Sequence, residues 1–359
     1  PDPTRPSPDP DLSDRTAIAA TGPRTATAPL VVGGAPLLEV DNLSVEFRTE
    51  YGVVKAVNEI SYTLAAGETL AILGESGCGK SVSAQAIMGI LDTPPGFVTG
   101  GKIRFRGEDL LTMTSKQQRD IRGEEISIIF QDALSSLNPV FTVGAQIGEM
   151  FRRHRGTSRK DAKAAAVELM EKVRIPSARE RVNDFPHQFS GGMRQRVMIA
   201  MAIALDPAVL IADEPTTALD VTVQAQIMDL LAELQRETGM GLILITHDLG
   251  VVGEIADRIA VMYAGRIVET GATDAIFTAP AMPYTQGLMA SIARVDQKGQ
   301  RLQPILGSPP DLARLPAGCP FQPRCPQATD LCLAERPLLR EVVPGRSSAC
   351  HYAEEVLGA

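Results

Sequence analysis

The segment Gly74-Glu-Ser-Gly-Cys-Gly-Lys-Ser81 is the feature that most constrains the fold of this chain. It follows the apolar run 69–73, which is typical of a buried strand, and it opens a helical pattern over 80–91. The segment matches the phosphate-binding loop G-x-x-x-x-G-K-S/T, which requires a strand before it and a helix after it. The sequence therefore predicts a loop that binds nucleotide phosphates between a strand and a helix.

The chemistry of this loop follows from its residue types. Glycines let backbone N–H groups curl around phosphates, and a helix N-terminus favours negative charge. Lys80 is expected to reach the β- and γ-phosphates, and Ser81 to place a hydroxyl on Mg²⁺. Cys78 is interpreted as a small filler residue, with a redox switch as the alternative. The residues predicted here to bind nucleotide are Gly74, Glu75, Ser76, Gly77, Cys78, Gly79, Lys80, Ser81 and Val82.

Apolar runs alternate with helical patterns along the rest of the chain. Such alternation indicates an α/β fold with a mostly parallel sheet. Between 132 and 190 the pattern is mainly helical, which predicts a helical subdomain inserted into the core. Strands are expected at 38–47, 69–73, 126–130, 209–212 and 242–246, and helices at 80–91, 157–173, 193–205 and 221–238.

Composition excludes some classes of function. The net charge is −8, aromatic residues make up 4% and Trp is absent, so neither a positive footprint nor stacking platforms for nucleic acid are expected. The apolar run 197–205 is far shorter than the roughly 20 residues that a membrane span needs. The N-terminus lacks the layout of a signal peptide. A soluble protein is therefore expected, with no nucleic-acid partner and with any membrane role supplied by other subunits.

Two carboxylates follow the apolar run 209–212. Asp213 at the tip of a strand can hold Mg²⁺, directly or through water. Glu214 can polarise or deprotonate an attacking water. Together with the phosphate-binding loop, this pair predicts hydrolysis of a nucleoside triphosphate.

The segment Phe189-Ser-Gly-Gly-Met-Arg-Gln-Arg196 resembles the L-S-G-G-Q signature of the ABC ATPase family. Ser190, Gly191 and Gly192 match, whereas Phe189 and Met193 differ from the commonest form. The resemblance implies a RecA-like P-loop core, with a mostly parallel sheet, an antiparallel β part, an inserted helical subdomain and a small C-terminal extension. It implies ATP and Mg²⁺ as ligands.

Other segments resemble further motifs of this family, in the family's order. Gln131 resembles the Q-loop glutamine, which touches Mg²⁺ and the attacking water. Asp220 resembles the D-loop aspartate at a dimer interface, and His247 resembles the switch histidine that contacts the γ-phosphate. Tyr51 resembles the aromatic residue that stacks on adenine, with Phe47 as the alternative. The resemblance thus implies that Gln131, Glu214 and His247 are catalytic and that Ser81, Gln131 and Asp213 hold Mg²⁺.

The family resemblance also implies a dimer of ATPase units. In this family the signature of one unit completes the ATP site of another. Residues Ser190–Met193 would then face ATP bound to the partner, with backbone N–H groups and a helix N-terminus toward the γ-phosphate. The second ATPase is expected to be a paralogue.

Three stretches resemble the ATPase subunits of dipeptide and oligopeptide importers. The resemblance implies two transmembrane permease subunits, an extracytoplasmic peptide-binding protein and a peripheral position on the cytoplasmic face of a bacterial inner membrane. An importer of nickel or another small solute, or a soluble ABC ATPase without transport activity, are the alternatives. The stretches are Phe130-Gln-Asp-Ala-Leu-Ser-Ser-Leu-Asn-Pro139, Pro283-Tyr-Thr-Gln-Gly-Leu288 and Gly318-Cys-Pro-Phe-Gln-Pro-Arg-Cys-Pro326.

Four cysteines lie close together near the end of the chain, at Cys319, Cys325, Cys332 and Cys350. Four thiolates suit either an iron–sulfur cluster or Zn²⁺. The spacing lacks the C-x₂₋₄-C pairs usual for zinc, and the resemblance to peptide importers implies a 4Fe–4S cluster. Zn²⁺ and cysteines without metal are the alternatives.

The predicted organisation has three parts. Residues 1–36 are rich in Pro, Ala, Thr and Ser and are expected to be a disordered tail. Residues 37–271 form the nucleotide-binding domain, with the helical subdomain at about 132–190. Residues 272–359 form a C-terminal extension without a large core of its own, and they contain the cysteine cluster at 319–350.

Overall fold

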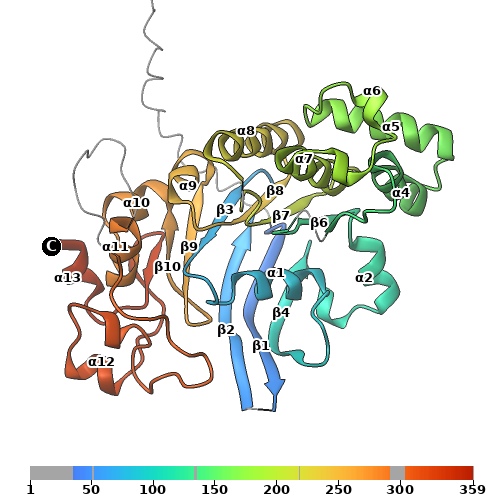
Figure 1. The fold of residues 1–359 in the computed structure, drawn as a ribbon. Coiled ribbons are helices and arrows are strands. Elements are labelled where there is room, and N and C mark those ends of the chain that lie inside the picture. Colours follow the sequence, from blue (N-terminus) through green and yellow to red (C-terminus); the bar gives the residue numbers. More distant parts are fainter. Residues whose placement is uncertain (1–34, 51, 133–135, 218, 292–303, 359) are drawn as a thin grey trace, which may run out of the picture. The chain divides into compact units, whose positions relative to one another are not determined.

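The main sheet carries the predicted phosphate-binding loop. Its strands are β3 (Thr69–Leu73), β6 (Ile126–Ile129), β7 (Val209–Asp213), β8 (Gly241–Ile245), β9 (Arg258–Tyr263), β10 (Arg266–Ala272), β11 (Arg340–Val343) and β12 (Arg346–Ser348). This computed structural model describes residues 35–50, 52–132, 136–217, 219–291 and 304–358. Within them the strand order is β11-β12-β10-β9-β3-β8-β7-β6 (Figure 1). Strands β9 to β6 are parallel, and the pairs beyond β9 are antiparallel.

The central strands are buried on both faces, because successive residues belong to two different apolar clusters. In β7, Leu210 and Ala212 lie in one cluster and Val209 and Ile211 in the other. Strands β3 and β8 alternate in the same way. Successive side chains of a strand point to opposite faces, so a strand covered on both sides reads as a continuous apolar run. The α/β fold predicted from those runs is confirmed.

A second sheet is antiparallel. It consists of β1 (Leu38–Thr49), β2 (Gly52–Leu64), β4 (Gly96–Phe105) and β5 (Glu108–Asp109), in the order β2-β1-β4-β5. Helix α1 (Lys80–Met88) contacts strands of both sheets, and its apolar side chains share one cluster with them. The sequence indicated β1 from its alternating pattern, whereas β2 and β4 were expected only through the family's antiparallel part.

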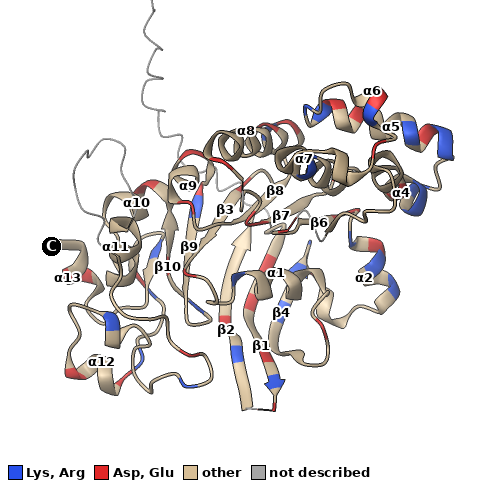
Figure 2. Ribbon diagram, in the orientation of Figure 1, with Lys and Arg blue, Asp and Glu red and all other residues tan. Residues whose placement is uncertain are grey.

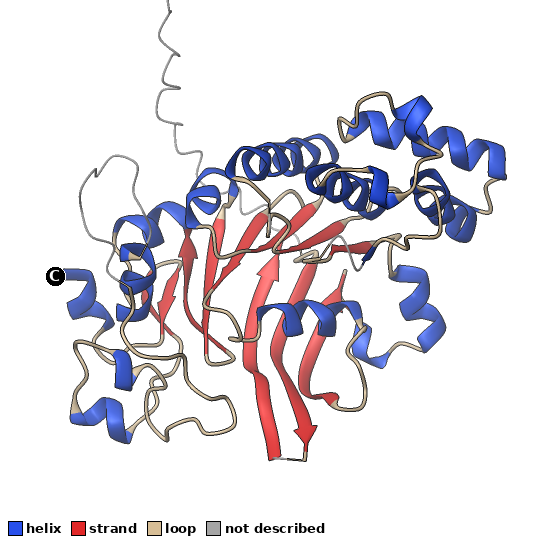
Figure 3. Ribbon diagram, viewed as in Figure 1, coloured by secondary structure: helices blue, strands red, loops and turns tan. Residues whose placement is uncertain are grey.

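Helices surround the strands (Figure 3). Three of the predicted helices begin where a serine or aspartate side chain accepts a hydrogen bond from the first turn, which is the usual N-cap arrangement. The helices not yet named are α2 (Ser115–Ile121), α4 (Val143–Arg155), α5 (Arg159–Lys172), α6 (Ala178–Arg181), α7 (Gly191–Ala202), α8 (Val221–Thr238), α9 (Leu249–Ile255), α10 (Thr273–Thr278), α11 (Pro283–Ala290), α12 (Asp330–Ala334) and α13 (Ala353–Gly358), with short 3₁₀ turns at Leu110–Thr112, Pro186–Gln188 and Gln322–Arg324.

Helices α4, α5 and α6 lie beyond β6, next to α7 (Figure 1). Their apolar side chains, including Ile147, Ala166 and Met170, join the same cluster as α7 and α8. Both basic and acidic residues are frequent along these helices (Figure 2). Within the described ranges, no helix combines the length and apolar character needed to cross a membrane.

The C-terminal residues pack into the main body. Strand β12 pairs with β10 and so adds to the main sheet. Cys319, Phe321 and Cys332 belong to the same apolar cluster as the central strands. The extension therefore shares the core of the main body, which explains why its sequence alone shows no core of its own.

Candidate functional site

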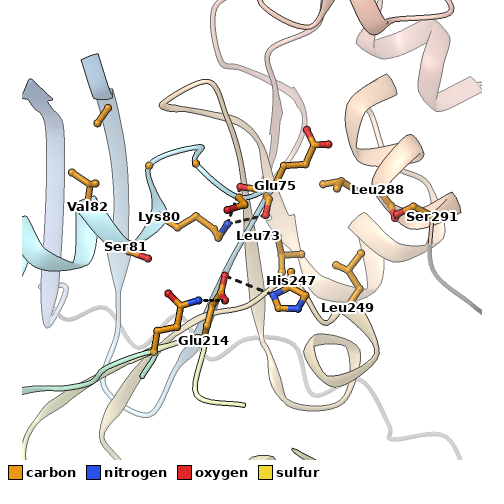
Figure 4. Close-up of a pocket in the computed structure, with 16 residues that line it drawn as sticks. Leu73, Glu75, Lys80, Ser81, Val82, Glu214, His247, Leu249, Leu288 and Ser291 are labelled. Carbon is orange, nitrogen blue, oxygen red and sulfur yellow. Dashed lines mark hydrogen bonds and ion pairs between the residues drawn. The ribbon is translucent and has the colours of Figure 1, made fainter. Parts of the chain in front are cut away.

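The predicted phosphate-binding residues line a cavity of about 540 Å³ at the carboxyl ends of the parallel strands (Figure 4). The carboxyl ends of neighbouring parallel strands meet at one edge of a sheet, and ligands bind at that edge in open α/β folds. Among the residues predicted for the phosphate-binding loop and for Mg²⁺, Cys78 and Asp213 do not line this cavity. The predicted residues that line it are Gly74, Glu75, Ser76, Gly77, Gly79, Lys80, Ser81, Val82, Gln131, Glu214 and His247.

Two glycines of the loop allow a backbone path that other residues resist. Gly74 and Gly79 have φ of 152° and 105°. A Cβ at Gly74 would overlap the carbonyl oxygen of Met262, and one at Gly79 would overlap that of Ala56. The loop therefore packs directly against the backbone of neighbouring strands, and it is held in a curled shape that leaves its N–H groups available for phosphates.

Lys80 is buried at the start of α1, with its ammonium group inside the loop. Its Nζ donates to the carbonyl oxygens of Gly74, at 2.8 Å, and of Glu75, at 3.0 Å. The ammonium group thus lies where phosphate oxygens would replace these two backbone acceptors.

Ser81 and Asp213 meet across the site. The Ser81 hydroxyl donates to Asp213 Oδ1 at 3.0 Å. Burial raises the pKa of the Asp213 carboxyl above its usual range; the bond from Ser81 opposes this effect, and the charge of Glu214 adds to it. A hydroxyl and a carboxylate are the oxygen donors that Mg²⁺ prefers, so these residues fit that ion.

Glu214 lies at the centre of a hydrogen-bonded group. Its Oε2 accepts from Gln131 Nε2 at 2.7 Å and from Thr217 Oγ1 at 2.9 Å, and its Oε1 lies 3.7 Å from His247 Nδ1 (Figure 4). Its φ is 45°, a left-handed conformation that strains a non-glycine residue. The fold thus brings together the three residues predicted to be catalytic, from the ends of three strands.

Comparison with known proteins agrees with this geometry. The family model "ABC transporter" matches residues 57–217, and "Oligopeptide/dipeptide transporter, C-terminal region" matches residues 268–332. The dipeptide transport ATP-binding protein DppD of Escherichia coli (strain K12) is 51% identical over 316 residues, which cover 88% of this chain and 96% of that protein. DppD of Bacillus subtilis (strain 168) is 53% identical over 296 residues, covering 82% and 88%. The chain belongs to the ABC transporter family.

A solved structure shows the same fold. The ATP-binding cassette MJ0796, described as dimeric and bound to ADP and phosphate in a post-hydrolysis state, matches with a TM-score of 0.60 at 26% identity. The match covers 66% of this chain and 98% of that one. It confirms the ABC ATPase architecture predicted from the resemblance, including the antiparallel sheet and the helical subdomain.

The predicted signature residues, Ser190–Met193, do not line the cavity of their own chain. Ser190 caps helix α7 by accepting from the N–H of Met193 at 3.4 Å, and Gly191 and Gly192 form the first turn of that helix. Asp220 caps α8 in the same manner. Tyr51 lies outside the described residues, and its alternative Phe47 packs against the cluster between the two sheets.

Two residues that contact the phosphate-binding loop were not predicted from the sequence. The Tyr284 hydroxyl accepts from the N–H of Glu75 at 3.0 Å, and Arg324 forms two hydrogen bonds with the Glu75 carboxylate. Both residues lie in stretches that resemble peptide importers, but nothing in those stretches indicates a contact with the phosphate-binding loop. The contacts arise only from the packing of the extension, through α11 and the segment around Arg324, against the loop.

The four C-terminal cysteines all line one small cavity of about 20 Å³, room for roughly one water molecule. All four are free thiols, and burial raises the pKa of Cys319, of Cys325 and of Cys350, the last to about 11. Among the residues that the structure describes, no group of three or more His, Cys, Asp or Glu side chains is arranged to hold a metal ion. The predicted iron–sulfur cluster is therefore not supported by this geometry.

Proposed function

We propose that this chain is the ATP-hydrolysing subunit of an ABC importer of dipeptides or oligopeptides. The support is the match of residues 268–332 to the C-terminal region of oligopeptide and dipeptide transporters, together with two dipeptide transport relatives that align over more than four-fifths of the chain. These matches favour peptides over nickel or another small solute.

The site residues divide the work of hydrolysis. Lys80 exchanges its backbone acceptors for phosphate oxygens, which fixes the triphosphate in the loop. Mg²⁺, held by Ser81, Asp213 and Gln131, would neutralise charge on the phosphates. Glu214 orients a water and accepts its proton, because its carboxylate points into the cavity and is held by neighbouring donors. His247 follows β8 and contacts the γ-phosphate.

The complete site needs a second ATPase subunit. Ser190–Met193 do not line the cavity of their own chain, so we infer that they face the nucleotide of a partner, with Asp220 at the interface. We propose that the partner is a paralogue and that both bind two transmembrane permease subunits at the cytoplasmic face of a bacterial inner membrane. A peptide-binding protein outside that membrane completes the system.

The observation that carries this function is the Glu214 carboxylate, which is held by Gln131 and Thr217 beside the phosphate-binding loop. We expect Glu214→Gln in the assembled transporter to lower steady-state ATP hydrolysis by about 10²–10⁴-fold, the contribution of a general base, and to retain MgATP binding. Glu237→Gln, on the exposed surface of α8, is the matched control and should leave hydrolysis unchanged. Unaltered hydrolysis in Glu214→Gln would contradict the assignment.

We also propose that the four thiols hold a 4Fe–4S cluster, with one Zn²⁺ as the alternative. The proposal rests on the resemblance of the cysteine-containing stretch to peptide importers and on the four thiols lining one cavity. As placed in the structure, the described side chains do not form a metal site, so metal analysis decides the question. Iron, sulfide and zinc analysis of anaerobically purified protein tests this: about four irons support the cluster, one zinc supports the alternative, and no metal rejects both. Cys78→Ser should keep the metal, whereas Cys332→Ser should lose it.

A further inference from the structure

Arg324 connects the C-terminal extension to the phosphate-binding loop. Its Nη1 and Nη2 lie 2.6 Å and 2.8 Å from the two carboxylate oxygens of Glu75, a residue 249 positions away in the sequence. The Arg324 side chain is 4% exposed and that of Glu75 is 23% exposed. A two-pronged bond of this kind combines charge with fixed geometry, and it is less screened by solvent than a surface pair.

The guanidinium group of Arg324 is itself held in place. Its Nε donates to the carbonyl oxygen of Leu306 at 3.0 Å, and its Nη1 also donates to the Tyr263 hydroxyl at 3.3 Å. These bonds come from the segment before the cysteines and from β9. The orientation of Arg324 therefore depends on how the extension packs on the main sheet.

An aromatic cluster holds the loop from the same side. The rings of Tyr263, Tyr284 and Phe321 pack with centroids 4.4–5.4 Å apart, and Tyr284 is fully buried. The Tyr284 hydroxyl accepts from the N–H of Glu75. Both the backbone and the side chain of Glu75 are thus bound by residues that lie after the core motifs of the ATPase.

The charge of Glu75 matters because its residue lines the nucleotide cavity near Lys80 (Figure 4). A free carboxylate there would repel the phosphates of ATP and attract the Lys80 ammonium group away from them. The bond to Arg324 cancels this charge and turns the carboxylate toward the extension.

We propose that Arg324 is a positioning residue for ATP binding, which makes the nucleotide affinity of this subunit depend on correct packing of its cysteine-containing extension. The inference rests on the proposed ATPase function. Arg324 directly precedes Cys325, one of the four cysteines that line the small cavity. Metal binding by those thiols would therefore act on the same short segment that contains Arg324.

The test is a double-mutant cycle on the full-length chain, with MgATP affinity measured by calorimetric titration. Arg324→Ala is expected to raise the MgATP dissociation constant about tenfold, because the Glu75 carboxylate is left uncompensated in the cavity. The effect should shrink at high salt, since it is electrostatic. Glu75→Gln alone should tighten binding, and the double variant should return close to the wild-type value. Arg340→Ala, which breaks an exposed ion pair with Glu354 in the same extension, is the control.

The outcomes separate this inference from the proposed function. If wild-type protein fails to bind MgATP, the ATPase function itself is wrong. If wild-type protein binds but Arg324→Ala binds equally well, or if Glu75→Gln does not rescue Arg324→Ala, the inference is overturned and the pair only stabilises the fold. If Arg324→Ala does not fold, Arg324→Lys and Glu75→Gln replace it. The lysine variant should then show weaker binding at unchanged melting temperature, and unchanged affinity in both replacements would overturn the inference.

Discussion

Arg346 and Glu269 form a buried ion pair that joins the extension to the main sheet. Arg346 Nη2 lies 2.8 Å from Glu269 Oε1, and the two side chains are 6% and 0% exposed. Glu269 Oε1 also accepts from the N–H of Ala281 at 2.6 Å. Within the described part of the chain, Glu269 Oε2 and Arg346 Nε have no hydrogen-bond partner, so the pair is only partly satisfied.

This arrangement gives two different expectations for single and double substitution. Arg346→Ala leaves the Glu269 carboxylate buried without its countercharge, which typically costs about 3–5 kcal/mol in the free energy of unfolding. Arg346→Met combined with Glu269→Gln removes both charges, keeps an acceptor for the N–H of Ala281 and preserves volume. We expect the double variant to lie within about 1 kcal/mol of the wild type, because replacing a whole buried pair is often neutral.

Equilibrium urea unfolding, followed by circular dichroism, measures these differences. Arg340→Ala serves as the control, because its partner Glu354 is exposed and its loss should change the unfolding midpoint little. A cost below about 1 kcal/mol for Arg346→Ala would refute the reasoning about an uncompensated buried charge. A double variant as unstable as the single one would also refute it, since the loss would then come from packing.

Three further predictions concern other parts of the molecule. Lys80→Ala removes the ammonium group from the loop and should weaken MgATP binding at least about tenfold in a calorimetric titration, with a small effect pointing to another phosphate anchor. Gly144→Ala places a Cβ against Val182, and we expect overpacking of about 1–3 kcal/mol by urea unfolding; a neutral result would mean that the backbone yields. Two hydrogen bonds from Arg340 lower the pKa of Glu354 to about 2, so the small contribution of this exposed pair to stability is present above the ordinary pKa of 4.5 and is lost as the pH falls toward 2. Arg340→Ala should move the carbon-13 titration midpoint of Glu354 up toward 4.5, and an unmoved midpoint would refute the assignment.

Most of the fold and the catalytic motifs could be read from the sequence because their signals are local. The phosphate-binding loop is one contiguous strand, loop and helix, and its glycines and Lys80 identify it without any distant residue. The buried strands β3, β7 and β8 appear as short apolar runs because both of their faces are covered. The capped starts of α5, α7 and α8 likewise depend on neighbouring residues only.

Contacts between distant segments could not be read in this way. The bond between Glu75 and Arg324 spans 249 positions, and that between Gln131 and Glu214 spans 83. Strand β2 begins with exposed residues and carries no continuous apolar run, so only its pairing with β1 identifies it. The position of each of these segments depends on the packing of the whole chain. The residues of one segment alone therefore carry no pattern that identifies the distant residue it contacts.

The sequence by itself determined which chemistry this protein performs, because the loop, the carboxylates and the signature each require particular residue types at short spacing. The tertiary structure alone decided what surrounds that chemistry. It placed the signature outside the cavity of its own chain, gathered four thiols around one small cavity, and set Arg324 and Tyr284 of the C-terminal region against the loop. The physical reason is that a side chain's type is encoded locally, whereas its partner is chosen by the burial and pairing of segments far apart in the chain.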